Sequence, residues 1–280
     1  MSILYGASEG DIGNRARELE IAPYDRRMPP VVVVQHEPSV PPGSIAQVLE
    51  EDGFPYVVLE AWREPDWPDP GGLGALIVMG GTMHFEERDA YPFLRKSREL
   101  MAGALERGVP TLGVCLGSQM MSRVLGGDVR RAEARNAFFS PVQVETDDPV
   151  LEAFAAGAPV LQFHEDTFTL PPGATALARS ARSGLLQAFR YGDNAYAVQF
   201  HFEVDEPIVR GWCDNIGEAA LEREWGTSAR ELLSEGARHF REQDRAGRQL
   251  VRRFLDLVAG RAVAGPEGPA TRVALERRAT

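Results

Sequence analysis

The sequence predicts an α/β fold with a doubly wound, mostly parallel sheet and helices on both faces. From Val31 onward, strand-like and helix-like segments alternate along the chain, which is the pattern of a parallel sheet built from βαβ units. The run from Val31 to Gln35 is almost entirely valine, as expected of a strand buried on both faces. Glycines and reactive side chains follow several strands, at the edge where such sheets bind ligands.

The hydrophobic pattern of each segment gives the expected elements in order. Strands are expected at Val31 to Gln35, Pro55 to Glu60, Ala75 to Met79, Pro110 to Val114, Val142 to Glu145, Val160 to Phe163, Leu185 to Phe189 and Ala195 to Phe200. Helices are expected at Ser44 to Glu51, Ala90 to Arg107 and Leu116 to Val124, and over most of Pro207 to Ala259. In that last region, apolar stripes mark Ala229 to Arg241 and Ala246 to Val258.

One domain is expected over residues 31–260, a length that a single large α/β domain accounts for. Residues 1–30 are polar, mixed in charge and end in two prolines, so we expect an N-terminal arm that is partly disordered. Residues 261–280 are rich in alanine, glycine, proline and arginine. That composition offers little to bury and predicts a mobile tail.

Composition and charge exclude several classes of protein. A hydrophobic fraction of 44% and a charged fraction of 25% are ordinary for a globular domain. The net charge of −11 argues against nucleic-acid binding, because phosphate contacts need concentrated lysine and arginine. No stretch reads as a signal peptide or a membrane span. The two cysteines give no disulfide framework, and Cys213 reads as a packed helix residue. We therefore expect a cytoplasmic protein that binds neither membranes nor nucleic acids.

Cys115 lies where an apolar strand runs into a helix, between Gly113 and Gly117. Two glycines leave room for a sharp turn that would lift the thiol above the sheet edge, as in a nucleophile elbow. The start of the following helix offers unpaired N–H groups and a positive dipole end, which favour a thiolate. The alternative is a buried, inert cysteine, but a plain core strand gains nothing from the glycines. The motif therefore favours a nucleophile.

His201 and Glu203 follow the strand that ends at Phe200. Residues at positions i and i+2 of an extended chain face the same side. The Glu203 carboxylate can therefore hold the tautomer of His201 that turns its other ring nitrogen toward Cys115. Taken alone, such a pair is most often solvated and without a role, but together with the cysteine turn it predicts a base and its orienting acid.

Gly80 and Gly81 end another buried strand, Ala75 to Met79. Most such glycine pairs are ordinary turns. Here the backbone N–H of this loop and that of Leu116, just after the cysteine, can form a two-donor oxyanion hole.

These three segments, together with the stretch from Gln162 to Pro171, resemble the class I glutamine amidotransferases. The similarity is to free-standing members related to the glutaminase domain of GMP synthase, and it runs from about Val31 to about Ala259. It implies the doubly wound, flavodoxin-like fold of that family. It also implies a small-molecule amide as substrate, either glutamine or another γ-glutamyl compound, and no cofactor and no metal.

The resemblance assigns roles to the matched residues. It implies that Cys115 is the nucleophile, His201 the general base and acid, and Glu203 the orienting carboxylate. The loop at Gly80 and Gly81 and the N–H of Leu116 would form the oxyanion hole. Gln119 would line the glutamine pocket.

The chain also departs from the family pattern. Phe202 stands where relatives have proline, a change that leaves the matched histidine and glutamate in place. Asn136 and Phe138 stand where many relatives carry glutamate and glycine, on a loop that helps hold the amino-acid end of glutamine. Glu165 replaces a glycine, and Gln162 an aromatic-flanked histidine. These changes predict weak activity on free glutamine.

Several other polar side chains are candidates for the site. His36 ends the first strand and His84 follows the glycine pair, so either can line the site, although most such histidines are structural or solvated. His164, Glu165 and Asp166 are consecutive, and neighbours on an extended chain point to opposite faces. We therefore predict no metal site there.

Two classes of function stay open. The first is an enzyme that cleaves a γ-glutamyl amide through a thioester on Cys115, with water, an amine or another nucleophile as acceptor. It would be a glutaminase that supplies a separate synthetase, or a γ-glutamyl peptide or amine hydrolase or transferase that does not use free glutamine. No synthetase signature is visible, so any ammonia-consuming step would lie in another polypeptide. The second class is a catalytically silent protein with a regulatory or binding role, against which the intact cysteine, histidine and glutamate argue.

Overall fold

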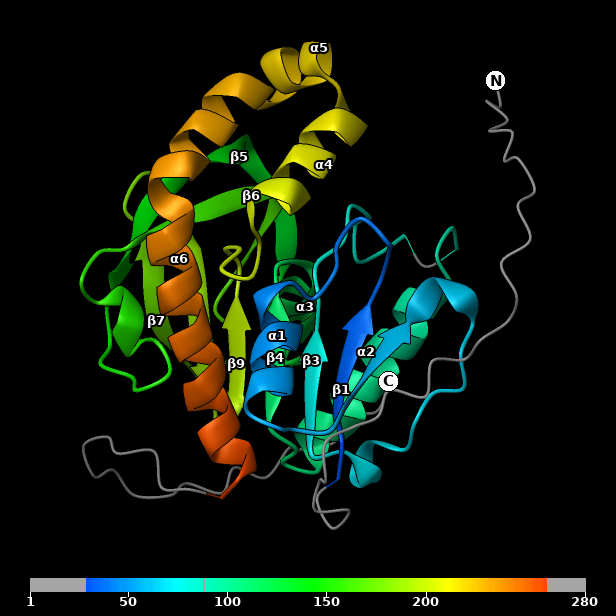
Figure 1. Ribbon diagram of the computed structural model, residues 1–280. Coiled ribbons are helices and arrows are strands. Elements are labelled where there is room, and N and C mark those ends of the chain that lie inside the picture. Colours follow the sequence, from blue (N-terminus) through cyan, green and yellow to red (C-terminus); the bar gives the residue numbers. More distant parts are fainter. Residues whose placement is uncertain (1–28, 88, 261–280) are drawn as a thin grey trace.

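The structure is a computed structural model that describes residues 29–87 and 89–260, and Figure 1 shows the whole arrangement. Nine strands form one mixed sheet in the order β2-β1-β3-β4-β9-β8-β7-β5-β6. The strands are β1 (Val31–Gln35), β2 (Tyr56–Glu60), β3 (Ala75–Val78), β4 (Thr111–Val114), β5 (Val129–Val144), β6 (Pro159–Phe168), β7 (Ala174–Ser180), β8 (Leu186–Tyr191) and β9 (Ala195–Val198). The helices are α1 (Ser44–Glu51), α2 (Phe93–Glu106), α3 (Leu116–Val124), α4 (Glu206–Ile216), α5 (Glu218–Ala220) and α6 (Ala229–Val258), with a π-helical turn, η4 (Leu221–Trp225), after α5.

The parallel part of the sheet confirms the predicted fold class. Strands β2, β1, β3, β4 and β9 pair in parallel, and helices cover both faces, α1 and α6 on one and α2 and α3 on the other (Figure 1). The valines of β1 explain this layering. Val31 and Val33 pack into the core under α1 and α6, whereas Val32 and Val34 pack into the core under α2 and α3. Alternation along one strand thus supplies both cores.

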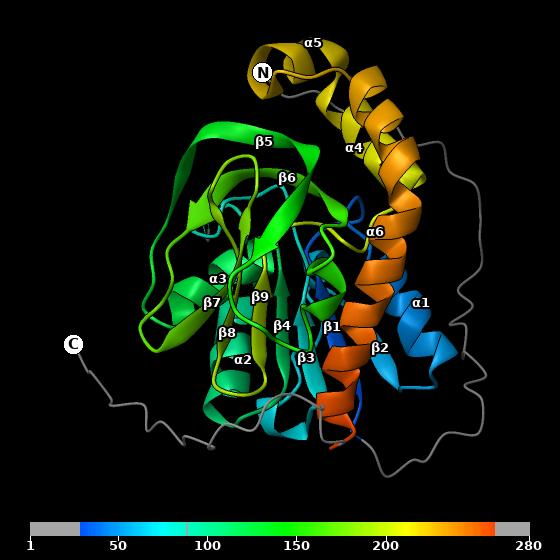
Figure 2. The same cartoon turned by 90° about the vertical axis from the view of Figure 1, so that its left-hand side faces the viewer.

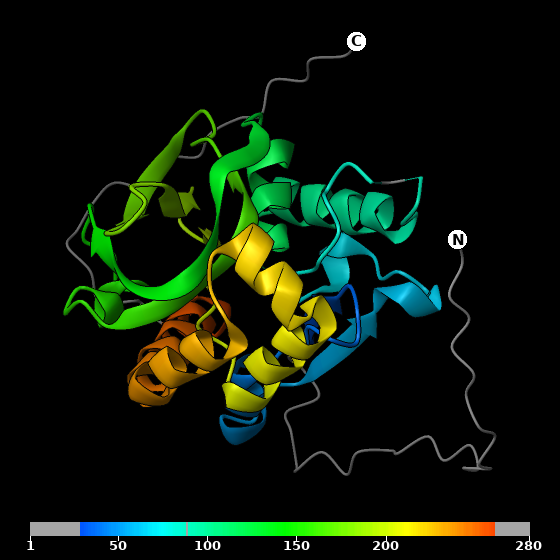
Figure 3. The same cartoon turned by 90° about the horizontal axis from the view of Figure 1, so that it is seen from above.

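An antiparallel extension completes the sheet. Strands β8, β7, β5 and β6 pair antiparallel beyond β9. The β5–β6 hairpin rises above the carboxyl ends of the parallel strands, and α4 lies beside it at the same end (Figures 1, 2 and 3). A third apolar cluster, with Phe139, Leu161 and Trp212 among its members, joins the hairpin to α4 and α6. The hairpin and α4 therefore build up the sheet edge where the reactive segments end.

The structure differs from the expected elements in three places. Strand β7 was not predicted, and β5 and β6 are longer than expected, because these strands lie at or near a sheet edge and their polar, half-exposed stretches lack a continuous apolar run. Helix α2 begins at Phe93, after Pro92, and not at Ala90. The two predicted apolar stripes belong to one continuous helix, α6.

Gly247 shows why α6 continues through a glycine. A Cβ at this position would lie 2.6 Å from the backbone oxygen of Phe202. The glycine therefore lets the helix approach the segment between His201 and Glu203.

Within the described residues, no helix is long and apolar enough to cross a membrane. The expected N-terminal arm, apart from Pro29 and Pro30, and the expected tail over residues 261–280 lie outside the described residues.

Candidate active site

Cys115 occupies a strained turn between β4 and α3. Its backbone has φ 51° and ψ −107°, a region that costs a non-glycine residue about 1–3 kcal/mol. The neighbouring glycines make the turn possible, since a Cβ on Gly113 would lie 2.5 Å from the oxygen of Gly117, and one on Gly117 would lie 2.0 Å from the oxygen of Val78. The turn expected from the sequence is present, and it places the cysteine at the N-terminus of α3.

His201 and Glu203 follow β9 and form a buried pair. The Nδ1 atom of His201 lies 2.7 Å from Oε1 of Glu203, and the side chains are 3% and 0% exposed. The backbone N–H of His201 donates to Leu161 of β6 at 2.8 Å, and the edge of its ring contacts Trp212. These contacts fix the ring, so that its Nε2 is left for another partner.

That partner is Cys115, and Gly80 lies against both side chains. A Cβ built on Gly80 would lie 3.4 Å from Cβ of Cys115 and 3.4 Å from Cε1 of His201. Burial alone would lower the pKa of His201, but the charges of Glu203 and Cys115, and hydrogen bonds to both, raise it to about 10. At neutral pH the arrangement therefore favours a protonated imidazole next to the Cys115 sulfur.

The proposed oxyanion donors lie next to this pair. Leu116 is the first residue of α3, so its N–H has no acceptor in a preceding helical turn. Gly81 lies against it, since a Cβ on Gly81 would come within 3.0 Å of Cδ2 of Leu116. His36 supports the loop from below, with Nδ1 at 3.2 Å from the oxygen of Gly80 and Nε2 at 3.1 Å from Oγ of Ser97.

Gln199 connects Gln119 to the sulfur of Cys115. Gln199, a residue to which the sequence pattern gave no role, donates its side-chain amide to Sγ of Cys115 at 3.6 Å. Gln119 in turn donates to Oε1 of Gln199 at 3.3 Å. Gln199 is fully buried. It precedes His201 by two residues and so faces the same side of the extended chain, which is the one sequence feature that could have placed it near Cys115.

A cavity of about 530 Å³ opens above Cys115, Gln119 and His201. The other wall is built by the β5–β6 hairpin, α4 and η4, and most of its side chains are charged or aromatic. Those contributors are Arg131, Arg135, Phe163, His164, Glu165, Asp166, Trp212, Glu224 and Trp225. Of the candidate histidines, His84 and His164 line this cavity and His36 does not.

The charged wall is ordered by ion pairs. Glu165 pairs with both Arg131 and Arg135, and Arg135 also pairs with Glu224. The Arg135 guanidinium lies over the Trp225 ring, 5.2 Å from its centroid. The tryptophan stacks on Phe163, with 4.5 Å between ring centroids, so η4 is held over the cavity.

Asp166 is the acidic group of this wall with the fewest hydrogen bonds. The residue is 6% exposed, and its Oδ1 accepts no hydrogen bond. The nearest basic side chains are Arg131, whose Nε lies 3.4 Å from Oδ1, and His84, whose Nε2 lies 3.6 Å from Oδ2. His164 lies beside it, with Nδ1 2.9 Å from the backbone oxygen of Asp166, and burial lowers the pKa of His164 to about 4.

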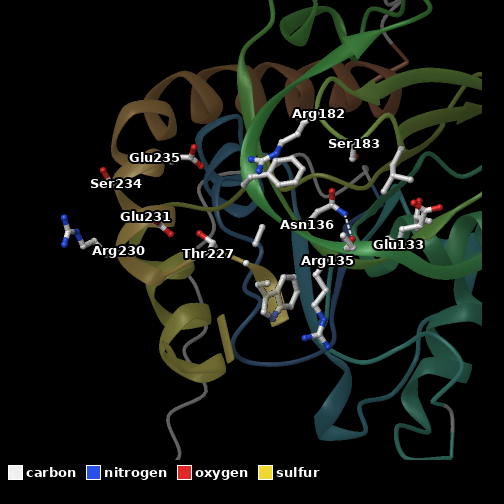
Figure 4. A pocket seen from close by; sticks show the side chains of 18 of the residues that line it. Glu133, Arg135, Asn136, Arg182, Ser183, Thr227, Arg230, Glu231, Ser234 and Glu235 are labelled. Atoms are coloured by element: carbon white, nitrogen blue, oxygen red, sulfur yellow. Dashed lines mark hydrogen bonds between the residues drawn. The ribbon is translucent and has the colours of Figure 1, made fainter. Parts of the chain in front are cut away.

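The positions of Asn136 and Phe138 differ from those predicted from the sequence. We expected them near the amino-acid end of the substrate, but they do not line the cavity that contains Cys115. They line a second cavity of about 940 Å³ on another side of β5 (Figure 4). The sequence pattern does not reveal this position, because the curvature of the β5–β6 hairpin sets the direction of each β5 side chain. Glu165 does line the cavity that contains Cys115.

Phe202 and Cys213 are core residues. Phe202 is fully buried against Phe200 and α6, so the aromatic side chain at this position fills core space between the proposed base and its acid. Cys213 is 2% exposed in α4, as predicted, and burial raises its pKa to about 11. Among residues 29–87 and 89–260, no three metal-binding side chains are grouped to hold an ion.

The sheet topology, the cysteine turn and the buried histidine–glutamate pair together point to one class of protein, the class I glutamine amidotransferases. The class I glutamine amidotransferase family model matches residues 44–207, more than half of the chain. The chain belongs to this family.

Similar curated and solved proteins agree with the family. The chain is 32% identical over 196 residues to a GMP synthase [glutamine-hydrolyzing] of Thermomicrobium roseum, a match that covers 64% of this chain and 35% of the relative. It is 34% identical over 97 residues to a GMP synthase [glutamine-hydrolyzing] subunit of Sulfolobus acidocaldarius, covering 34% of this chain and 52% of the relative. The chain thus spans about half of the latter protein and about a third of the former. A solved glutamine amidotransferase of Thermotoga maritima superposes with a TM-score of 0.73 at 28% identity, covering 81% of this chain and 97% of that one.

Proposed function

We propose that the protein hydrolyses the side-chain amide of glutamine or of another γ-glutamyl compound through a thioester on Cys115. The observation that carries this proposal is that Cys115 and His201 meet at the floor of one cavity, with the buried Glu203 hydrogen-bonded to His201. A thiolate, a proton donor and an orienting carboxylate in that order are the parts needed for acyl transfer.

The reaction then proceeds in two halves. The Cys115 thiolate attacks the amide carbonyl, and the resulting oxyanion accepts hydrogen bonds from the N–H groups of Gly81 and Leu116. As the C–N bond breaks, the His201 imidazolium gives its proton to the leaving nitrogen, which departs as ammonia or an amine. The neutral His201 next removes a proton from water, the hydroxide attacks the thioester, and the acid leaves as Cys115 is restored.

The charged wall of the cavity supports an α-amino acid end on the substrate. Asp166 lines the cavity with a carboxylate, and this suits an α-ammonium group. Arg131 and Arg135 lie on the same wall, and a guanidinium suits an α-carboxylate. A γ-glutamyl group carries both charges, so opposite charges on one wall fit it.

The size of the cavity supports the alternative of a larger amide. A volume of about 530 Å³ falls in the range of sites that take drug-sized ligands, about 300–1,000 Å³. A γ-glutamyl peptide or amine is therefore a second candidate substrate. The two curated relatives are a GMP synthase and one subunit of such an enzyme, which supports a separate synthetase as the consumer of ammonia if glutamine is the substrate.

One comparison tests the function and the site together. Purified protein is incubated with glutamine and with a panel of γ-glutamyl amines and peptides, and ammonia, free amine and glutamate are measured. We expect turnover of at least one substrate, abolition by Cys115→Ala, and full retention in the control variant Cys213→Ala. A chloroketone analogue of glutamine should add once, on Cys115. Labelling of Cys213 instead, or turnover by Cys115→Ala, would remove Cys115 from the mechanism.

A further inference from the structure

The second cavity, of about 940 Å³, lies outside the catalytic one and shares with it only the wall made by Arg135 and Trp225. It is formed by the outer side of β5, the turn between β7 and β8, and the first turns of α6. Five arginines and three glutamates line it, in a chain whose net charge is −11. Positive charge is therefore concentrated here against the trend of the whole protein.

Arg182 is the best-placed of these arginines. Its guanidinium lies over the ring of Phe138, with its carbon 4.1 Å from the ring centroid. Stacking on the ring holds the flat face of the guanidinium and leaves its N–H edge free. In the part of the chain that the structure describes, no carboxylate forms an ion pair with Arg182.

The neighbouring groups extend this arrangement. Figure 4 shows Arg182, Asn136 and Arg135 along one side of the cavity, with Arg230 on the opposite side, in α6. Asn136 is 3% exposed and gives one N–H to the oxygen of Ala134, which leaves a second N–H for a ligand. Arg135, over the Trp225 ring, forms a second arginine–aromatic pair at the other end.

The glutamates on the opposite side are already engaged. Glu231 accepts hydrogen bonds from the backbone and hydroxyl of Ser228 in the capping box at the start of α6. Glu235 faces the backbone N–H of Phe139 at 3.4 Å. Neither carboxylate neutralises Arg182, so the acceptors that this guanidinium needs have to come from solvent or from a ligand.

We propose that this second cavity binds a small molecule carrying a carboxylate or phosphate group, which Arg182 receives in a bidentate contact and to which Asn136 donates its second amide N–H. The Arg182–Phe138 pair gives the site both charge and flat apolar surface. A compact anion with several oxygens matches the donors that Arg182 and Asn136 offer.

Isothermal titration calorimetry on the full chain tests the site, because it needs no turnover and is independent of the proposed chemistry at Cys115. Sodium pyrophosphate and sodium citrate are titrated separately, and the tighter probe identifies which oxyanion the site prefers. We expect one site, with a Kd at least about tenfold weaker in Arg182→Ala, as for loss of one charge-assisted contact. Arg182→Lys, which keeps the charge but not the planar fork, should fall between them.

The matched control is Arg63→Ala, an exposed arginine that pairs with Glu60 beside β2, at the other edge of the sheet. It should bind both probes as tightly as the unmodified chain. Circular dichroism and thermal unfolding check that each variant is folded. If Arg182→Ala does not fold, the comparison of Arg182→Lys with the unmodified chain still tests the site. No binding of either probe, or equal binding by the unmodified chain, Arg182→Ala and Arg182→Lys, would overturn the proposal.

Discussion

Gln199 donates its side-chain amide to the sulfur of Cys115, and Gln119 fixes the direction of that amide. The distances are 3.6 Å from Nε2 of Gln199 to Sγ and 3.3 Å from Nε2 of Gln119 to Oε1 of Gln199. Because Gln119 donates to the carbonyl oxygen of Gln199, the NH₂ group of Gln199 is the end that faces the sulfur. A fully buried N–H donor at this position stabilises a thiolate more than a thiol.

Replacing Gln199 by methionine should therefore make Cys115 less reactive at neutral pH. A hydrogen bond to a charged group contributes about 1.5–3 kcal/mol, so we expect alkylation of Cys115 by iodoacetamide to slow about tenfold or more. Peptide mass spectrometry of Cys115 across a pH series measures this. Gln162→Met is the matched control, since Gln162 is equally buried but does not contact the sulfur. Equal alkylation rates in both variants would contradict the assignment.

The variant Gln119→Glu distinguishes two possible roles of Gln119, which are to orient the amide of Gln199 and to bind the substrate. A carboxylate can only accept, so the amide of Gln199 should rotate to donate to it and turn its oxygen toward Cys115. We expect slower alkylation even with iodoacetamide, which does not occupy a glutamine pocket. If Gln119→Glu slowed only the turnover of glutamine, the residue would act on the substrate and not through Gln199.

Glu203→Gln should move the alkaline limb of the activity profile to lower pH. Burial lowers the pKa of His201, and the charges of Glu203 and Cys115 raise it to about 10, so the imidazolium that protonates the leaving group is lost only as pH rises toward that value. Removing the Glu203 charge lowers this pKa, and activity should then decline at a lower pH. Initial rates between neutral and alkaline pH, with circular dichroism to confirm folding, measure the shift. An unmoved limb would exclude Glu203 as the group that sets it.

Asp166→Asn should weaken recognition of a substrate ammonium. In this variant we expect KM for the preferred γ-glutamyl substrate to rise about tenfold or more, with a smaller change in kcat, since loss of a charge-assisted contact costs about 1.5–3 kcal/mol. Glutaric acid monoamide, which has the same amide and no α-ammonium, is the control substrate. Its kcat/KM should be nearly equal in the unmodified protein and in Asp166→Asn. An equal loss for both compounds would show that Asp166 has only a structural role.

Stability should fall as the pH is lowered below neutrality. Burial lowers the pKa of both His36 and His164 to about 4, from a reference value of 6.5. Between about pH 4 and pH 6.5 the unfolded chain binds protons that the folded protein does not. The contribution of these two rings to stability is therefore fully present above about pH 6.5 and is lost as the pH falls toward about 4. At about pH 5 each ring should cost on the order of 2 kcal/mol. Urea unfolding at neutral pH and at about pH 5 measures the loss.

The matched variant for that measurement is His36→Gln. It removes one titrating ring, and so the difference in unfolding free energy between the two pH values should shrink by a similar amount. The same difference in variant and unmodified protein would mean that His36 does not contribute.

The parallel sheet and the turn at Cys115 could be predicted from the sequence because both depend on near neighbours. Buried parallel strands need continuous apolar runs, and β1 and α1 have the predicted bounds. A Gly–X–Cys–X–Gly segment between strand and helix leaves few other conformations, and a His–X–Glu pair on extended chain must share a side. The catalytic roles of these residues stay a prediction. Their placement follows from two local conformations and from one strand pairing, β4 with β9, which brings the two segments together.

Only the tertiary structure decided which distant side chains share a cavity. The antiparallel strands β5 to β7 carry polar, half-exposed stretches, so their pattern was weak, and the bulge in the β5–β6 pairing sets the direction of each side chain. For that reason Asn136 and Phe138 face the second cavity, although Glu165 faces the first. The contact of Gln199 with Cys115 spans 84 positions of the chain. Such contacts follow from how the sheet and hairpin pack, and the order of residues does not reveal them.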